Sequence, residues 1–134
     1  MKTSKIIYRG NLRTEATHLL SGNTIITDAP PDNNGKGEAF SPTDLLATSL
    51  GCCMTTIMGI VAARHEMNIE GLQVEITKVM ESNPRRVAEI IVDFRFPENQ
   101  FDEKQMELLK NAALTCPVAK SLSAELKQTV NFSF

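Results

Sequence analysis

The chain has 134 residues, the length of one domain, and its formal net charge is −2 from 14 basic and 16 acidic residues. This balance excludes the basic surface of a nucleic-acid binder, and one Tyr without any Trp offers few rings for base stacking. The first residues lack an apolar region of signal-peptide length, and the 3 cysteines form no disulfide framework. We therefore expect a cytoplasmic protein whose cysteines are thiols.

The N-terminal part of the chain is typical of short strands joined by tight turns. Turn signals at Arg9-Gly10-Asn11 and Ser21-Gly22-Asn23 divide residues 4–28. A polar loop, residues 29–40, follows. Ser41 then suits a helix N-cap, with Pro42 at the first helical position and Asp44 three residues after the cap, so the sequence predicts a helix from Pro42 to about Met67.

This predicted helix carries no charged side chain from Leu45 to Ala63, which is long enough for a membrane span. It also contains a serine, three threonines and two glycines, and the rest of the chain alternates like a soluble sheet. We therefore expect no membrane, and a helix buried on nearly every face. A chain of this size covers such a helix only in part, so a second copy is expected to complete the burial in a homodimer.

The remaining residues alternate between strand and helix patterns. The predicted elements are a strand at 72–77, a turn at Ser82-Asn83-Pro84, a strand at 90–96, a helix from Phe101 to Leu114, a helix from Pro117 to Leu126 and a last strand at 130–134. No repeat is visible. The sequence thus predicts one α+β domain over residues 1–134.

Two cysteines occupy positions suited to thiol chemistry. Cys53 lies inside the uncharged helix, and Cys116 precedes Pro117, where a thiolate would face the positive end of a helix dipole. If the two sulfurs meet, they can form a reversible disulfide. Burial as a small apolar side chain is the alternative for both, and it fits Cys52 better, because adjacent helical residues point about 100° apart.

Other catalytic chemistries find no support in the sequence. The cysteines form no Cys-x-x-Cys pair, and His18 and His65 are isolated, so we expect no metal site and no cofactor. No nucleophile-elbow sequence and no phosphate-binding glycine loop are present.

Three segments resemble a known family. Ser41-Pro42-Thr43-Asp44-Leu45-Leu46, Ser49-Leu50-Gly51-Cys52-Cys53 and Thr115-Cys116-Pro117-Val118 are similar to the motifs of the OsmC/Ohr family, named for osmotically inducible protein C and the organic hydroperoxide resistance protein. The resemblance runs over nearly the whole chain. It implies an α+β fold as an intertwined homodimer, with two long central helices flanked by antiparallel sheets and active sites at the dimer interface.

The resemblance also implies a thiol peroxidase. Cys53 would attack an organic hydroperoxide, Cys116 would resolve the sulfenic acid, and an external dithiol would reduce the disulfide. Burial opposes a thiolate, so a cation must offset it, and the family uses an arginine held by a carboxylate from the first turn of the central helix. Arg13 is the candidate and Arg9 the alternative, because both lie in the N-terminal hairpin, although either also fits a solvated surface arginine.

The chain departs from the family pattern at that carboxylate. Thr43 stands at the matching position and cannot form a salt bridge, so Asp44 is the nearest acid, either as a catalytic carboxylate or as a helix cap. Two functions therefore remain: a peroxidase for organic hydroperoxides, or a binding module that holds an apolar small molecule in a dimer-interface pocket. Adjacent sulfurs with an arginine nearby favour the enzyme, and distant sulfurs favour the binder.

Overall fold

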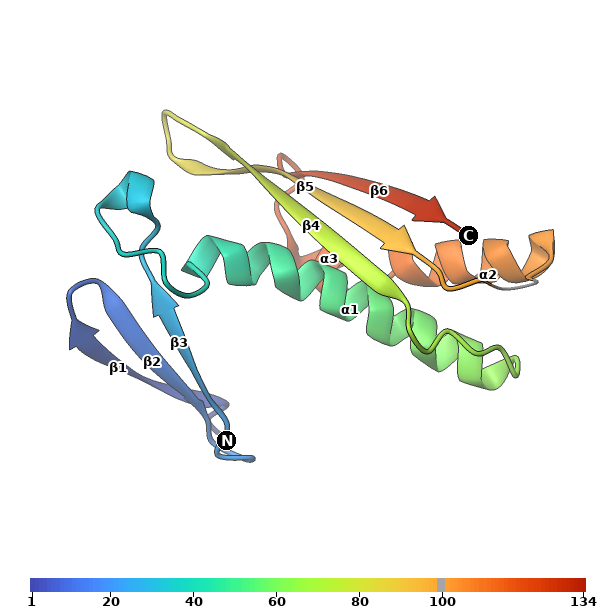
Figure 1. The fold of residues 1–134 in the computed structure, drawn as a ribbon, viewed down its shortest axis with the longest axis horizontal. Coiled ribbons are helices and arrows are strands. Elements are labelled where there is room, and N and C mark those ends of the chain that lie inside the picture. Colours follow the sequence, from blue (N-terminus) through green and yellow to red (C-terminus); the bar gives the residue numbers. More distant parts are fainter. Residues whose placement is uncertain (99–100) are drawn as a thin grey trace. The chain divides into compact units, whose positions relative to one another are not determined.

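The computed structural model describes residues 1–98 and 101–134, and it is an α+β fold of two compact units, Met1–Leu46 and Ala47–Phe134 (Figure 1). In chain order the elements are β1 (Ser4–Gly10), β2 (Arg13–His18), β3 (Thr24–Asp28), the 3-10 turn η1 (Pro31–Asn33), α1 (Pro42–Arg64), β4 (Gln73–Glu81), β5 (Arg86–Arg95), α2 (Glu103–Leu114), α3 (Pro117–Ser121) and β6 (Lys127–Ser133).

The N-terminal unit is built on an antiparallel sheet of order β1-β2-β3. Both predicted turns are confirmed, and each uses a glycine in the left-handed region, with φ of +84° at Gly10 and +78° at Gly22. The apolar side chains of this sheet remain uncovered: Ile6, Tyr8 and Ile25 are each at least half exposed. A three-stranded sheet needs an apolar face packed against something, so this unit does not bury enough by itself.

The polar loop between β3 and α1 is closely packed. The backbone N–H groups of Asn33 and Gly35 both donate to the carbonyl of Pro30, at 2.9 and 3.0 Å. A Cβ at Gly35 would lie 1.7 Å from the carbonyl oxygen of Ala29, so only glycine fits there. The loop is thus held in one shape by its own backbone.

The start of α1 follows the prediction. The Asp44 carboxylate accepts the backbone N–H of Ser41 at 2.9 Å, and the Ser41 hydroxyl accepts the backbone N–H of Asp44 at 3.0 Å. These reciprocal bonds are a capping box with Asp in place of Glu. The structure therefore gives Asp44 the capping role.

The end of α1 lies three residues before the predicted one. Glu66 takes a left-handed φ of +55°, and the backbone N–H of Met67 donates to the carbonyl of Ala62 at 2.8 Å. This is a Schellman ending without the usual glycine, and it stops the helix at Arg64. Met67 is apolar and buried, which made the helical pattern look longer.

The second unit contains a sheet of order β4-β5-β6, in which β4 and β5 are antiparallel and β5 and β6 are parallel. The expectation of purely antiparallel sheets is therefore wrong. α2 and α3 form a crossover between β5 and β6, and such a connection returns the chain to the same end of the sheet.

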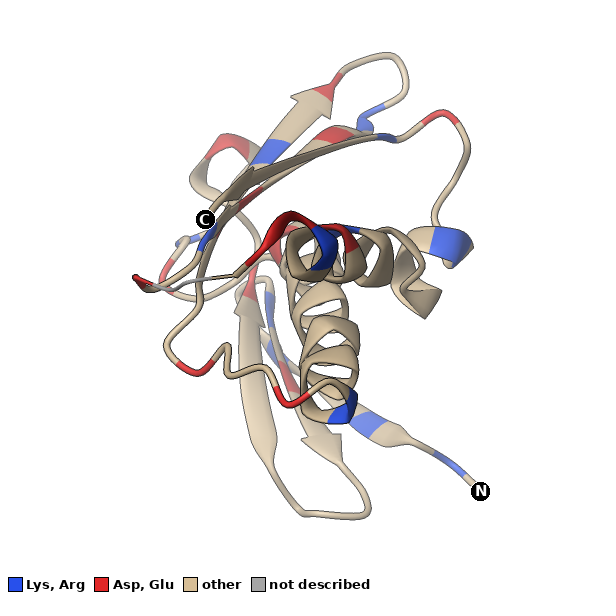
Figure 2. Ribbon diagram, turned by 90° about the vertical axis from the view of Figure 1, so that its right-hand side faces the viewer, with Lys and Arg blue, Asp and Glu red and all other residues tan. Residues whose placement is uncertain are grey.

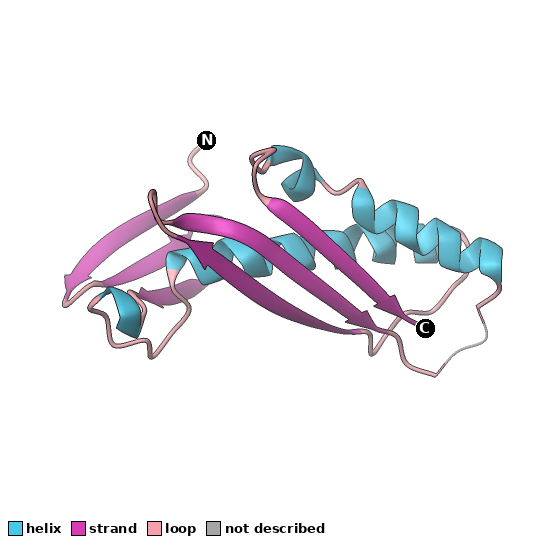
Figure 3. Cartoon of the chain, turned by 90° about the horizontal axis from the view of Figure 1, so that it is seen from above, coloured by secondary structure: helices cyan, strands magenta, loops and turns pink. Residues whose placement is uncertain are grey.

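The core of this unit lies between the sheet and the helices. Figures 1 and 3 show the three strands running along α1 and α2. Its largest fully buried side chains include Leu50, Met54 and Met58 of α1, Ile90, Val92 and Phe94 of β5, and Leu109 of α2. α1 and β4 approach closely at Gly51, where an added Cβ would lie only 2.6 Å from Cδ1 of Ile76.

One face of α1 remains open in this chain. Cys52, Thr56, Ile60 and Ala63 recur at helical spacing and are exposed, and we call this set the uncharged stripe. Figure 2 shows α1 as tan over most of its length. The helix is long and apolar enough to cross a membrane by length and composition, but 33% of its most apolar window is buried in the core.

The third helix is shorter than predicted and ends at Ser121, so Leu122 and Leu126 lie beyond it. The hydroxyl of Ser123 accepts the backbone N–H of Glu125 at 3.2 Å, and the Ser123 carbonyl accepts that of Leu126 at 3.0 Å. A serine that binds nearby backbone in this way favours a turn over a continued helix.

Candidate functional site

Cys116 is held at the N-terminus of α3. It is the N-cap residue, Pro117 takes the first helical position, and the Cys116 sulfur accepts the backbone N–H of Ala119 at 3.3 Å. The side chain is fully buried, at 0% exposure, within the hydrophobic core. This thiol therefore sits in a dry and fixed position.

Cys53 approaches Cys116 from α1. Its side chain is half-buried and packs against the core, and its thiol lies close enough to that of Cys116 to raise the pKa of Cys116. The fold thus brings together two sulfurs that are far apart in sequence. Cys52 is exposed on the uncharged stripe, as expected because it is adjacent to Cys53 in the helix and therefore points in another direction.

The environment of Cys116 opposes its ionisation. Burial raises the pKa of the Cys116 thiol, the backbone N–H of Ala119 acts against this rise, and the contact with Cys53 adds to it. The pKa of Cys116 is therefore raised although its thiol lies at the positive end of a helix dipole. α3 has only five residues, so the positive charge at its N-terminus is weak, and the effect of full burial on the pKa of Cys116 is larger.

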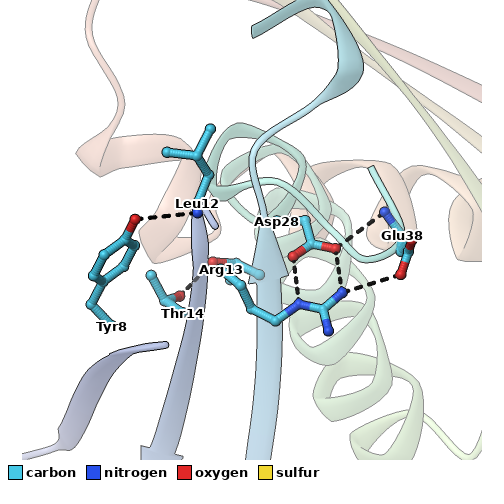
Figure 4. A network of polar contacts seen from close by, with 7 residues as sticks. Tyr8, Leu12, Arg13, Thr14, Asp28 and Glu38 are labelled. Carbon is cyan, nitrogen blue, oxygen red and sulfur yellow. Dashed lines mark hydrogen bonds and ion pairs between the residues drawn. The ribbon is translucent and has the colours of Figure 1, made fainter. Parts of the chain in front are cut away.

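Three charged side chains of the N-terminal unit, those of Arg13, Asp28 and Glu38, lie together, and we call them the arginine cluster (Figure 4). The Arg13 guanidinium donates from Nε to Asp28 Oδ1 at 2.7 Å and from Nη2 to Asp28 Oδ2 at 2.9 Å. Nη2 also donates to Glu38 Oε2 at 3.3 Å. Arg13 and Asp28 are directly opposite each other on β2 and β3, so the sheet register makes this bidentate pair.

The arginine cluster holds a buried charge. Asp28 is 2% exposed, and its hydrogen bonds from Arg13 lower the pKa of the carboxyl below its usual value despite burial. The same bonds raise the pKa of Arg13, so both groups are ionised at neutral pH. The alternative arginine, Arg9, pairs with Glu15 at 3.2 Å on the surface, with half of its side chain exposed.

The sequence missed Asp28 and Glu38. The turn at Ser21-Gly22-Asn23 contained the signal for Asp28, because that turn sets the register that places Arg13 opposite it. Glu38 had no such signal, since its position depends on the shape of the loop.

Two further features bear on the predicted chemistry. Within residues 1–98 and 101–134, no three His, Cys, Asp or Glu side chains are grouped as a metal ion would require. A shallow, mostly apolar hollow of about 340 Å³ lies between α1 and β4, and its lining includes Cys52, Thr48, Thr55 and Val74.

The comparisons with known proteins agree with the motifs. The model of the family described as OsmC-like protein matches residues 35–131. None of the curated proteins matches the chain. A solved structure from Psychrobacter arcticus 273-4, described as a candidate osmotic stress induced and detoxification response protein, shares 55% identity with a TM-score of 0.95, covering 98% of this chain and 96% of its own.

More distant structures share the fold alone. An OsmC like protein from Mycoplasma pneumoniae has 21% identity and a TM-score of 0.79, with 99% of this chain and 96% of that chain covered. An organic hydroperoxide resistance protein OsmC from Legionella pneumophila has 14% identity and a TM-score of 0.76, with 100% and 98% covered. In this soluble fold, the apolar α1 is the core helix and not a membrane span. The chain belongs to the family of OsmC-like proteins.

Proposed function

We propose that this protein is a thiol-dependent peroxidase that reduces organic hydroperoxides. The observation that carries the proposal is the proximity of the thiols of Cys53 and Cys116, which α1 and the start of α3 bring together. The family includes proteins named for organic hydroperoxide resistance, which supports the same chemistry.

The proposed cycle uses both thiols. The Cys53 thiolate attacks one oxygen of the peroxide, the O–O bond breaks, and the leaving alkoxide takes a proton to become an alcohol. Cys53 is then a sulfenic acid. The Cys116 thiol condenses with it, forming the disulfide and releasing water. An external dithiol exchanges with this disulfide and is itself oxidised, which returns both cysteines to thiols.

The different degrees of burial of Cys53 and Cys116 support these roles. Cys53 is half-buried, so a peroxide can reach it, whereas Cys116 is fully buried and has a raised pKa, which suits a thiol that reacts only with its neighbour. The side chains around Cys53 are apolar, and this favours a hydrophobic peroxide over hydrogen peroxide.

The binding-module alternative predicts distant sulfurs. The contact between Cys53 and Cys116 therefore favours the enzyme. The shallow hollow lined by Cys52 could hold an apolar molecule, but it is mostly open and Cys53 is not among its lining residues.

The proposal includes Arg13 as the cation that stabilises the Cys53 thiolate. Its bidentate pair with a buried carboxylate supports Arg13 over Arg9, whose pair is on the surface. The bonds of Asp44 at the helix start fit a cap, and a catalytic role for its carboxylate stays a prediction. We also propose that the protein acts in the cytoplasm, where dithiol reductants are available.

We further propose that the protein works as a homodimer. The uncharged stripe of α1 and the apolar side chains of the β1-β2-β3 sheet are both left exposed by a single chain. Leaving apolar surface in water costs about 25 cal/mol per Å². A second copy supplies the same kinds of surface, which fits a two-fold interface.

The test is chemical. Reduced protein treated with one equivalent of cumene hydroperoxide should form an intramolecular disulfide between Cys53 and Cys116, seen by peptide mapping. Cys53→Ser should abolish peroxide reduction, and Cys116→Ser should give one turnover and then accumulate oxidised Cys53. Cys52→Ser is the matched control and should retain most activity. Two free thiols after treatment, or an active Cys53→Ser protein, would contradict the proposal.

A further inference from the structure

The face of the β4-β5-β6 sheet that points away from the core carries a polar hollow. β5 lies between β4 and β6 (Figure 1), and its Val92 and Phe94 side chains are buried in the core, so the alternating Asp93 and Arg95 lie on the other face. The hollow has a volume of about 260 Å³, and its lining residues are Gln73, Glu75, Asp93, Phe94, Arg95 and Ser133. Pockets for drug-sized ligands begin at roughly 300 Å³, so this hollow suits a smaller molecule.

The strand register sorts the polar side chains of the hollow into two rows across the sheet. In the first row, Arg95 lies opposite Gln73 on β4 and Ser133 on β6, and all three side chains can donate hydrogen bonds. In the second row, Asp93 lies opposite Glu75 on β4, and both side chains are carboxylates, which accept. The two rows are separated by two residues of strand, roughly 7 Å. The hollow therefore has a donor row beside an acceptor row.

Most of these polar groups have no protein partner. Within residues 1–98 and 101–134, the side chains of Gln73, Glu75 and Arg95 form no hydrogen bond and no ion pair. Asp93 accepts a single hydrogen bond through Oδ1, from Nδ2 of Asn131 at 2.7 Å. Like charges directly opposite each other on neighbouring strands are destabilising, as Glu75 and Asp93 are here. The guanidinium can thus bind an anion, and a cation would relieve the repulsion between the carboxylates.

We propose that this hollow binds a small zwitterion, a molecule with one ammonium and one carboxylate group, such as a free amino acid. The ligand carboxylate binds the donor row, where the Arg95 guanidinium can bind it bidentately. The ligand ammonium binds the acceptor row of Glu75 and Asp93. A simple anion is repelled by the two carboxylates and a simple cation by Arg95, so charge complementarity selects a molecule that carries both charges.

The proposed site is separate from the cysteine chemistry. Cys116 belongs to the core, together with Val92 and Phe94, whereas the hollow is on the opposite face of the sheet. The two proposals can therefore fail independently, because binding at the hollow requires no redox step.

The experiment is an NMR titration of the full ¹⁵N-labelled chain with glycine, β-alanine and 4-aminobutanoate. These probes place one, two and three carbons between the ammonium and the carboxylate. At least one of them should shift the backbone amides of residues 73–75, 93–95 and 131–133 and approach saturation by about 20 mM. Acetate and ethylammonium each offer only one of the two charges and should bind at least about 10-fold more weakly.

Substitutions assign the two ends of the ligand. Arg95→Gln and Glu75→Gln should each weaken binding by about 10-fold or more, because each removes a charge-assisted hydrogen bond, and Arg95→Lys should retain more affinity than Arg95→Gln. The matched controls are Arg86→Gln and Glu81→Gln, which remove the same kinds of charge from an ion pair at the other end of the β4-β5 hairpin. Both controls should bind as the unaltered chain does.

Several results would overturn the proposal. None of the three zwitterions may produce a saturable shift by about 20 mM, or the shifts may lie outside the hollow. Acetate or ethylammonium that binds as tightly as the zwitterion would indicate a simple ion site. Equal losses in Arg95→Gln and Arg86→Gln would indicate a general effect of charge. The ¹⁵N spectrum of each variant reports whether the chain remains folded.

Discussion

The burial of Cys116 makes the second step of the proposed cycle depend on pH. The attacking group in that step is the Cys116 thiolate, and burial raises the pKa of this thiol above its ordinary value. At an ordinary value, about 3 in 100 cysteine thiols are ionised at pH 7, so the ionised fraction of Cys116 is smaller still. Oxidation of Cys53 removes its own effect on Cys116 but leaves burial, the largest cause.

The expected rate of disulfide formation follows from this fraction. Well below the pKa, the thiolate population rises about tenfold for each pH unit, so the rate between pH 6 and 8 should rise by about 100-fold. The assay is a single turnover with excess cumene hydroperoxide, stopped by acid, with the Cys53–Cys116 disulfide measured by mass spectrometry. Dimedone added as a competing trap should label more Cys53 at lower pH.

Two results would refute this reasoning. A rate that changes less than about threefold from pH 6 to 8 would mean that Cys116 is already ionised near neutrality, as the helix dipole alone would favour. A plateau reached below pH 8 would mean the same. Cys116→Ser is the control, since it should form no disulfide and should be labelled by dimedone at every pH.

Two further predictions concern assembly and packing. Sedimentation should show a dimer at micromolar concentration, with an interface of roughly 2,000 Å² or more, and Thr56→Arg in the uncharged stripe should weaken association by about 100-fold or more, because like charges then meet across a two-fold interface. A folded wild-type monomer at that concentration would contradict the dimer. Gly51→Val should lower the free energy of unfolding by about 1–3 kcal/mol, because its side chain enters space filled by Ile76. This loss should shrink in an Ile76→Ala background, and equal losses in both backgrounds would show that the contact is not responsible.

Local chemistry explains why much of the fold was predictable. The turn glycines, the Ser41–Asp44 capping box and the alternation of β5 are each set by neighbouring residues, and all are present. The errors came where distant or backbone effects decide. α1 ends at a Schellman motif without glycine, and β6 joins β5 in parallel because α2 and α3 carry the chain across the sheet.

The candidate site divides in the same way. The sequence by itself determined the family, through two cysteine motifs in the right order, and singled out Cys53 and Cys116. Only the tertiary structure decided that the two thiols lie close together and that Cys116 is the fully buried one, because burial depends on the core formed by α1, β5 and α2. It also decided the partner of Arg13. A salt bridge between β2 and β3 depends on strand register and on the loop that follows, and Asp28 shows no sign of its burial in its immediate neighbours along the chain.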